Sequence, residues 1–180
     1  DHSIDDSRMA ARELALRFLA FHLLGAANYS GDMDRFLSNT MRVINQAPRI
    51  STAQLERIFY PHQHPAITAV SLDVLNATFE RSMKRCRQFF GAYAFRKAVP
   101  GQRRTPVNKA LFDSWSTIMA EISDDDFRSL VNRKAKFTEA YEMLLNRDEF
   151  ERAISRDASS ITGVRYRYHL LNKLVIDILE

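Results

Sequence analysis

The chain has 180 residues, of which 46% are apolar and 27% charged, with only five Gly and five Pro. This composition argues against a disordered or all-β chain and suits one globular domain rich in helices. The single cysteine, Cys86, excludes an intrachain disulfide; because no signal-peptide pattern is present either, we expect a cytoplasmic protein.

Apolar residues recur at helical spacing from residue 7 onward and along the rest of the chain. The first helix is predicted over residues 7–24, with a stop at Gly25. A second begins at an Asp32 cap. A third, short helix opens with Ser51 and Gln54 in the spacing of a capping box.

The middle of the chain predicts two longer helices. The first runs from about residue 68 to 90 and stops at Gly91. Thr105 and Pro106 resemble a cap followed by a proline in the first turn, so the second is expected over residues 106–122.

Three acidic residues at 124–126 are typical of a helix start, and that helix is predicted to continue to Leu145. Asp148 is expected to cap a short helix that ends near Ser155. Thr162 is expected to cap a last one that ends near Leu179.

The fold class predicted from these segments is all-α, a single bundle-like domain of seven or eight helices. No window shows sustained strand-type alternation. We expect residues 1–6 to be a linker and residues 7–180 to form the domain. The polar opening without an initiator Met suggests a fragment of a larger protein.

Positive charge is concentrated in one part of the sequence. Residues 81–109 hold nine Lys or Arg and no Asp or Glu, which leaves 17 basic and 22 acidic side chains for the rest of the chain. A local excess of this kind suits phosphate binding, because each neutralised phosphate releases condensed counterions. The alternative is a solvated helix face at Arg81, Lys84 and Arg85 together with a loop that pairs with acids such as those at 124–126.

Four aromatic residues open the same stretch: Phe89, Phe90, Tyr93 and Phe95. They could stack on nucleic-acid bases, but aromatics at this spacing more often belong to a core. We therefore expect these rings to pack in the core and to anchor the basic stretch that follows them, which ends at Lys109.

Other candidate sites have weaker support. His62 and His64 have no companion ligands at metal-site spacing, so we predict no metal site and no cofactor. Cys86 lies between two arginines but resembles a small hydrophobe more than an activated thiol. Glu13 and Arg17 suit a structural ion pair. Since no complete set of acid, base and nucleophile is visible, we predict no catalytic residues and no enzyme activity for this chain, although a parent protein could be a nuclease or NTPase.

Three stretches in order resemble one family: "RMAARELALRFLAFHLLG" with "MDRFLSNTM" after it, "FGAYAFRK", and "VNKALFDSWS". They are similar to the helical second half of the ParB/sulfiredoxin-like domain family at the N-terminus of GmrSD-type modification-dependent restriction proteins. In that family the chemistry is attributed to the preceding half, with its Asp-Gly-Gln-Gln-Arg motif, and often to a following HNH nuclease domain. The resemblance implies a helical domain of an anti-phage defence protein, and it singles out Phe95, Arg96, Lys97, Asn108 and Lys109.

Two functions remain open at this stage. In the first, the domain contacts DNA phosphates through Arg96, Lys97, Arg103, Arg104, Asn108 and Lys109, where Arg103 and Arg104 rest on charge alone. In the second, the basic loop docks on the protein's own catalytic half or on another subunit of a homo-oligomer. Neither function involves a membrane.

Overall fold

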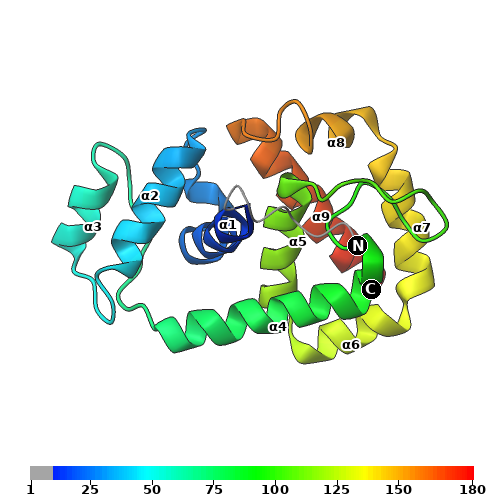
Figure 1. Cartoon of the computed structure of the whole chain (residues 1–180), viewed down its shortest axis with the longest axis horizontal. Helices are drawn as coiled ribbons and strands as arrows, with labels where there is room; N and C mark the ends of the chain where they lie inside the picture. The colour runs from blue at the N-terminus through cyan, green and yellow to red at the C-terminus, as the bar shows by residue number, and fades with distance from the viewer. Residues whose placement is uncertain (1–9) are drawn as a thin grey trace.

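A computed structural model describes residues 10–180 of the chain (Figure 1). Helices account for almost all of the regular structure in this range, and the only strand-like pairings in it are two isolated bridges, Arg49 with Ala69 and Arg96 with Val107. The fold is therefore all-α, as predicted. The helices are α1 (Ala10–Leu24), α2 (Met33–Ile44), α3 (Thr52–Phe59), α4 (Leu72–Phe90), α5 (Lys109–Glu121), α6 (Asp124–Asn132), α7 (Lys134–Leu145), α8 (Asp148–Ala153) and α9 (Ile161–Leu179).

The helices are arranged around α5 (Figure 1). Helices α2 and α3 lie at one end of the molecule beside α1, and α6, α7 and α8 lie at the other end. Helix α4 runs along one side, while α9 packs behind α5. No helix in residues 10–180 is long and apolar enough to cross a bilayer.

Helix α5 is the centre of the core, because every residue from Ala110 to Ala120 is buried. Its hydroxyl side chains are accommodated by bonds to main-chain carbonyls of the same helix, such as Thr117 to Asp113 at 2.7 Å and Ser114 to Ala110 at 3.0 Å. Buried polar groups normally find such partners, since an unpaired one costs roughly 1–3 kcal/mol. The centre of α5 is thus fully packed and fully bonded.

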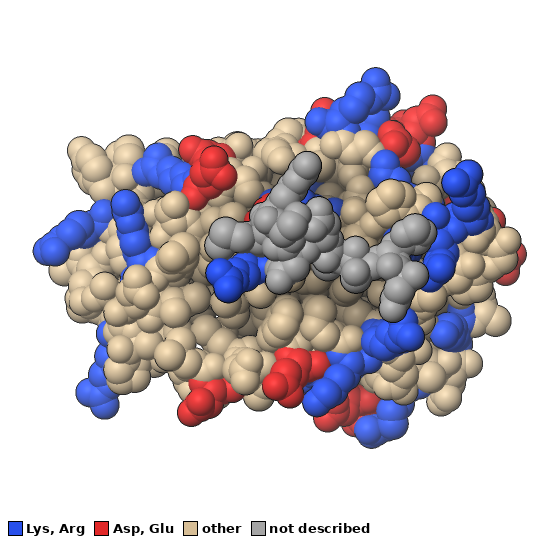
Figure 2. All heavy atoms as spheres, in the orientation of Figure 1, with Lys and Arg blue, Asp and Glu red and all other residues tan. Residues whose placement is uncertain are grey.

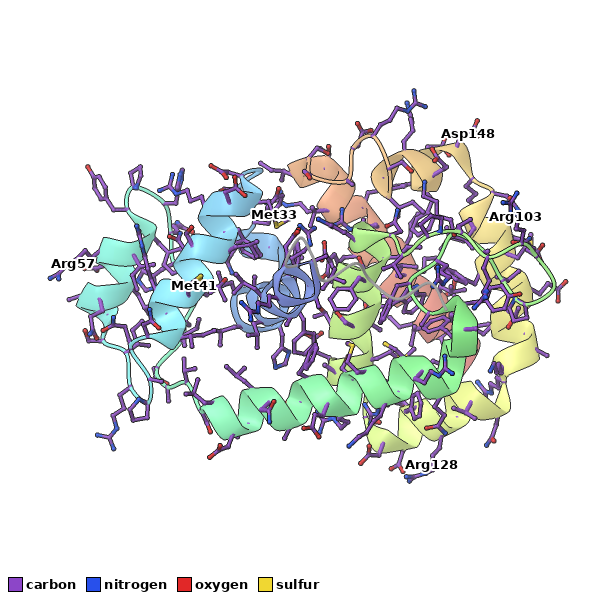
Figure 3. The ribbon with its side chains drawn as sticks, viewed as in Figure 1. Met33, Met41, Arg57, Arg103, Arg128 and Asp148 are labelled. Atoms are coloured by element: carbon purple, nitrogen blue, oxygen red, sulfur yellow. The ribbon has the colours of Figure 1, made fainter. Side chains whose placement is uncertain are left out.

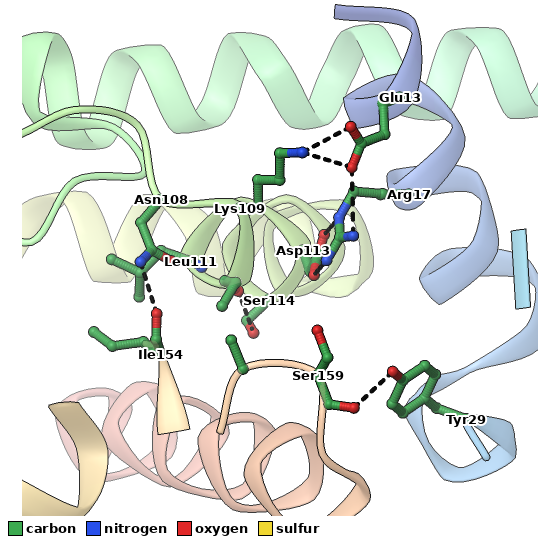
Figure 4. Close-up of polar contacts among 12 residues, drawn as sticks. Glu13, Arg17, Tyr29, Asn108, Lys109, Leu111, Asp113, Ser114, Ile154 and Ser159 are labelled. Atoms are coloured by element: carbon green, nitrogen blue, oxygen red, sulfur yellow. Dashed lines mark hydrogen bonds and ion pairs between the residues drawn. The ribbon is translucent and has the colours of Figure 1, made fainter. Parts of the chain in front are cut away.

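A buried ionic network joins α1, α5 and α9, and Figure 4 shows the part of it that links α1 to α5. Arg17 donates to both carboxylate oxygens of Asp113, at 2.8 and 2.6 Å, and Arg167 approaches one of them at 3.4 Å. Burial raises the pKa of the Asp113 carboxyl, whereas the two guanidinium groups oppose that rise. The chain of charges continues outward through Glu13, 3.6 Å from Arg17, to Lys109. The predicted Glu13–Arg17 ion pair is confirmed as part of a larger structure.

Several predicted helix ends are confirmed. Gly25 and Gly91 follow α1 and α4 with positive φ angles of 80° and 60°. Asp32 caps α2, and Ser51 and Gln54 form both bonds of a capping box at α3. The predicted linker, residues 1–6, and the predicted start of the first helix at residue 7 lie outside the described residues.

The predicted start of α5 is wrong by three residues. Thr105 and Pro106 do not begin the helix; the cap is Asn108, whose side chain accepts from the Leu111 N–H at 2.9 Å. Thr105 instead accepts from the Lys97 N–H at 3.0 Å. The residues before Asn108 are extended because they pair with the opposite leg of the loop between α4 and α5.

The predicted helix ending at Leu145 is two helices, α6 and α7, separated by Arg133. The main chain of Arg133 leaves helical geometry at φ −101° and ψ 20°. Its guanidinium donates to the Ile178 carbonyl at 2.5 Å and also to the Leu179 carbonyl, at the end of α9. These bonds satisfy carbonyls that a helix terminus otherwise leaves unpaired.

Three smaller boundaries also differ from the prediction. Helix α4 begins after a Ser71 cap rather than near residue 68, because Ala69 pairs with Arg49. Asp148 is the first residue of α8 and not its cap. Ser160, rather than Thr162, caps α9.

Candidate functional site

The loop of residues 94–108, which we call the basic loop, connects α4 to α5 and crosses in front of α7 (Figure 1). Its two ends meet, since the Asn108 N–H donates to the Phe95 carbonyl at 2.8 Å. Phe95 has φ of +61°, an unusual conformation for an aromatic residue that costs of order 1–3 kcal/mol. The Phe95 ring packs on Phe112 at 4.7 Å between centroids. The surrounding structure therefore holds the loop in a conformation that a free chain would avoid.

Arg96 clamps the two legs of the basic loop together. Its Nε donates to the Ala92 carbonyl at 3.1 Å, and its Nη1 donates to the Thr105 carbonyl. Only 9% of Arg96 is exposed. A planar guanidinium can bridge two acceptors in this way, whereas a lysine offers a single point charge.

The residues directly before and after Arg103 and Arg104 are held in place by hydrogen bonds. Before them, Gln102 accepts from the Tyr93 hydroxyl at 3.0 Å and donates to Glu142 of α7 at 2.8 Å. After them, Thr105 is held by Arg96 and by the Lys97 N–H. The two arginines therefore project from a fixed backbone.

Lys97 of the basic loop and Lys109, the first residue of α5, are neutralised within the molecule. Lys97 lies 3.1 Å from Glu151 of α8 and also donates to Ser155. The Ser155 hydroxyl and Lys97 together lower the pKa of the Glu151 carboxyl. Lys109 pairs with Glu13 at 2.7 Å (Figure 4).

Asn108 likewise has two structural partners. Besides capping α5, it donates to the Ile154 carbonyl at 2.7 Å (Figure 4). Of the six residues predicted to contact nucleic acid, Asn108, Arg96, Lys97 and Lys109 therefore already use polar groups inside the fold. Arg103 and Arg104 do not.

On α4 the basic residues have different environments. Arg85 is buried, donates to the Met119 carbonyl at 2.9 Å and pairs with Asp124. The predicted alternative, in which Arg85 belongs to a solvated helix face and the loop pairs with residues 124–126, is therefore wrong for Arg85, because this helix residue is buried and itself pairs with Asp124. Arg81 donates to the Ala120 carbonyl at 3.0 Å, and Lys84 pairs with Glu80 at 3.4 Å.

Three arginines in this region are exposed and have no ion pair or hydrogen bond to any other side chain of residues 10–180: Arg87, Arg103 and Arg104. Two adjoining hollows lie between them, of about 230 and 300 Å³. Arg96 and Arg104 line both hollows, Arg87 lines the first and Arg103 the second, and neither hollow is lined by an acidic residue. We call these four residues the arginine surface.

The figures show the setting of this surface. Basic side chains gather along the right-hand side of the face in Figure 2, over the region where Figure 1 shows the basic loop and the end of α4. Figure 3 shows Arg103 projecting from the loop, beyond the body of the molecule. The positive charge is therefore accessible from solvent.

The aromatic residues anchor the loop, as predicted. Phe89 and Phe90 pack against Phe137 and Trp115 in the core. Phe95 rests on α5, and the Tyr93 hydroxyl is bonded to the loop. Of these rings, Phe95 lines a hollow of the arginine surface, and that ring packs on Phe112.

The remaining candidates show structural roles. Cys86 is 1% exposed, and burial raises the pKa of its thiol to about 12, so it is a small core residue. His64 Nδ1 lies 3.0 Å from the Pro65 carbonyl. Within residues 10–180 no group of three or more His, Cys, Asp or Glu is arranged to hold a metal ion.

Sequence reasoning missed the roles of Arg87, Asp113 and Arg167. A signal for Asp113 exists, because it is the one charged residue in the run Ala110–Ala120, whose other side chains are apolar or carry a hydroxyl. No sequence signal separates Arg87 from Arg85, since only packing shows which of the two is buried.

Comparisons of the chain with protein-family models, with curated proteins and with solved structures gave no match.

Proposed function

We propose that this chain is a non-catalytic helical domain that holds DNA by its phosphates through the basic loop. The observation that carries the proposal is the pair Arg103 and Arg104, exposed, free of acidic partners in residues 10–180 and fixed between anchored residues. Guanidinium groups bind phosphate oxygens well because their planar donors match two oxygens at once. A fixed loop loses little conformational entropy on binding.

The positions of the acidic residues around the basic loop support Arg103 and Arg104 as the residues that bind phosphate. Glu13, Glu142 and Glu151 approach the loop, and they bind Lys109, Gln102 and Lys97. Arg103 and Arg104 have no acidic partner in residues 10–180, so their guanidinium groups can bind a ligand. Because the one aromatic ring that lines the hollows, Phe95, is held against Phe112, recognition would involve the phosphates rather than stacked bases, and binding would be independent of sequence.

The biological context we propose is a restriction or anti-phage defence protein of the GmrSD type. The three stretches that resemble its ParB/sulfiredoxin-like domain support this context. Within the described residues they cover α1, most of α2, the last residue of α4 with the start of the basic loop, and the N-terminal part of α5. The chemistry of such a protein would then reside in another domain.

Fluorescence anisotropy with a labelled duplex of about 20 base pairs tests the function. We expect weak binding at low salt that declines steeply as salt rises, with Arg103 and Arg104 together contributing about −1.8 to the slope of log K against log salt. The test variant is Arg103→Glu/Arg104→Glu. The matched control is Arg42→Glu/Arg57→Glu, which changes the net charge equally at exposed residues of α2 and α3.

The proposal fails if the unaltered chain does not bind at low salt, or if the test and control variants weaken binding equally. If the test variant retains its DNA affinity but changes its elution volume in size-exclusion chromatography, the loop contacts a protein subunit instead. Circular dichroism of both variants checks that the helices are intact.

A further inference from the structure

We infer that the arginine surface forms two neighbouring phosphate seats that follow one DNA strand, and that Arg87 of α4 completes the first seat. This inference rests on the proposed function and extends it to a residue outside the basic loop. The first seat is the hollow between Arg87 and Arg104, and the second is the hollow between Arg103 and Arg104. Arg96 lies at their common edge.

The first seat combines charge with close access to the backbone. Besides its arginines, the hollow of about 230 Å³ is lined by Met83, Phe95 and three small residues: Gly91, Ala92 and Ala94. Small residues allow a ligand to approach the main chain closely. The C-terminal end of α4 carries partial negative charge that would repel an anion. Arg87 is the exposed cation in the last turn of that helix, so this seat depends on it.

The second seat is formed by the basic loop alone. Thr105, Pro106 and Val107 line its hollow of about 300 Å³ together with three arginines. Thr105 Oγ1 accepts from the Lys97 N–H, and its own proton can be donated to a phosphate oxygen. Arg96 fixes the distance between the seats because it bonds to Ala92 on one side and to Thr105 on the other.

The structure favours a phosphodiester backbone over a free nucleotide as the occupant. Each hollow is at or below the lower end of the size range of small-molecule pockets, about 300 Å³. Neither hollow is lined by a carboxylate that could bind a ribose, and the one aromatic ring in their walls, Phe95 of the first hollow, packs on Phe112. Two adjoining cationic hollows without such groups suit consecutive phosphates on one strand.

Single substitutions to Gln test the seats by the same anisotropy titration. Each phosphate contact contributes about −0.9 to the slope of log K against log salt. This contribution vanishes at about 1 M salt, so at about 50 mM salt the loss of one contact reduces affinity about tenfold. We expect that reduction for Arg87→Gln and for Arg103→Gln, and a larger one for Arg104→Gln because Arg104 lines both hollows. The control is Lys84→Gln, an exposed residue on the same helix that pairs with Glu80, and it should leave the affinity unchanged.

Double substitutions separate two seats from one diffuse charge. Arg87→Gln and Arg103→Gln should be additive, since they act on different hollows. Arg87→Gln should have less effect in an Arg104→Gln background, because that seat has already lost an arginine. If the losses of affinity add fully in both pairs, the arginines act as one diffuse positive charge and the division into two seats is wrong.

Other outcomes distinguish this inference from the proposed function. If Arg87→Gln binds DNA normally while Arg103→Glu/Arg104→Glu does not, the two-seat arrangement is wrong and the proposed function stands. If inorganic pyrophosphate displaces the duplex at micromolar concentration, the hollows bind free phosphates and the strand assignment is wrong. If the unaltered chain does not bind duplex DNA at all, both fail.

Discussion

Replacing Asp113 with Asn would remove the carboxylate that lies between two buried guanidinium groups, and we expect a large loss of stability. Asp113 is fully buried, and so is Arg167, while Arg17 is 7% exposed. Removing one partner of a buried ion pair costs roughly 3–5 kcal/mol, because the remaining charge is left uncompensated. Here the remaining charges keep partial support, since Arg17 retains Glu13 and Arg167 retains main-chain carbonyls. We therefore expect a loss of about 3 kcal/mol, at the lower end of that range.

Urea unfolding followed by circular dichroism measures this loss. The matched control is Asp177→Asn, which removes an exposed ion pair with Lys173 and should cost about 0–1 kcal/mol. A combined Arg17→Met/Asp113→Leu/Arg167→Met variant should recover much of the stability, because apolar side chains of similar volume often replace a buried ionic cluster without loss. If Asp113→Asn costs no more than Asp177→Asn, the reasoning about uncompensated charge is refuted.

Three further substitutions or reactions test single features of the fold. Gly163→Ala would place Cβ 2.1 Å from the Asp157 carbonyl oxygen, so we expect a loss of about 1–3 kcal/mol, measured as a lower midpoint of thermal unfolding. Cys86 should not react with a thiol reagent such as 5,5′-dithiobis(2-nitrobenzoic acid) in the native protein and should react fully in denaturant; native-state labelling would contradict its burial. Asn108→Ala should cost about 1–2 kcal/mol through the lost cap, whereas Pro106→Ala should cost much less; the reverse order in urea unfolding would restore the helix start predicted from the sequence.

Local patterns were sufficient to predict the fold class and several helix ends. The Ser51 capping box and the glycines after α1 and α4 are local features, determined by residues a few positions apart. The start of α5 and the break at Arg133 depend on contacts between distant segments, such as Asn108 with Ile154 and Arg133 with the end of α9. Helical periodicity contains no information about such contacts.

At the candidate site, too, some features could be predicted from local sequence and others depend on contacts between distant segments. The sequence correctly identified where positive charge is concentrated, and it correctly predicted that the aromatics anchor the loop. It could not show which cations are free, because the partners of Lys97 and Lys109 lie 54 and 96 residues away in the chain. Exposure and pairing, rather than composition, select Arg87, Arg103 and Arg104, and the hollows between them add the buried Arg96 to the arginine surface.

The complete burial of residues 110–120 in α5 also has a consequence for synthesis on the ribosome. Helix α5 is covered on one side by α1 and α4, which precede it, and on the other by α9, which ends at Leu179. Until α9 has left the exit tunnel, one apolar side of α5 is exposed to water, and such surfaces promote aggregation. A nascent chain stalled before residue 161 should therefore bind chaperones, whereas one that has released the whole of α9 should not.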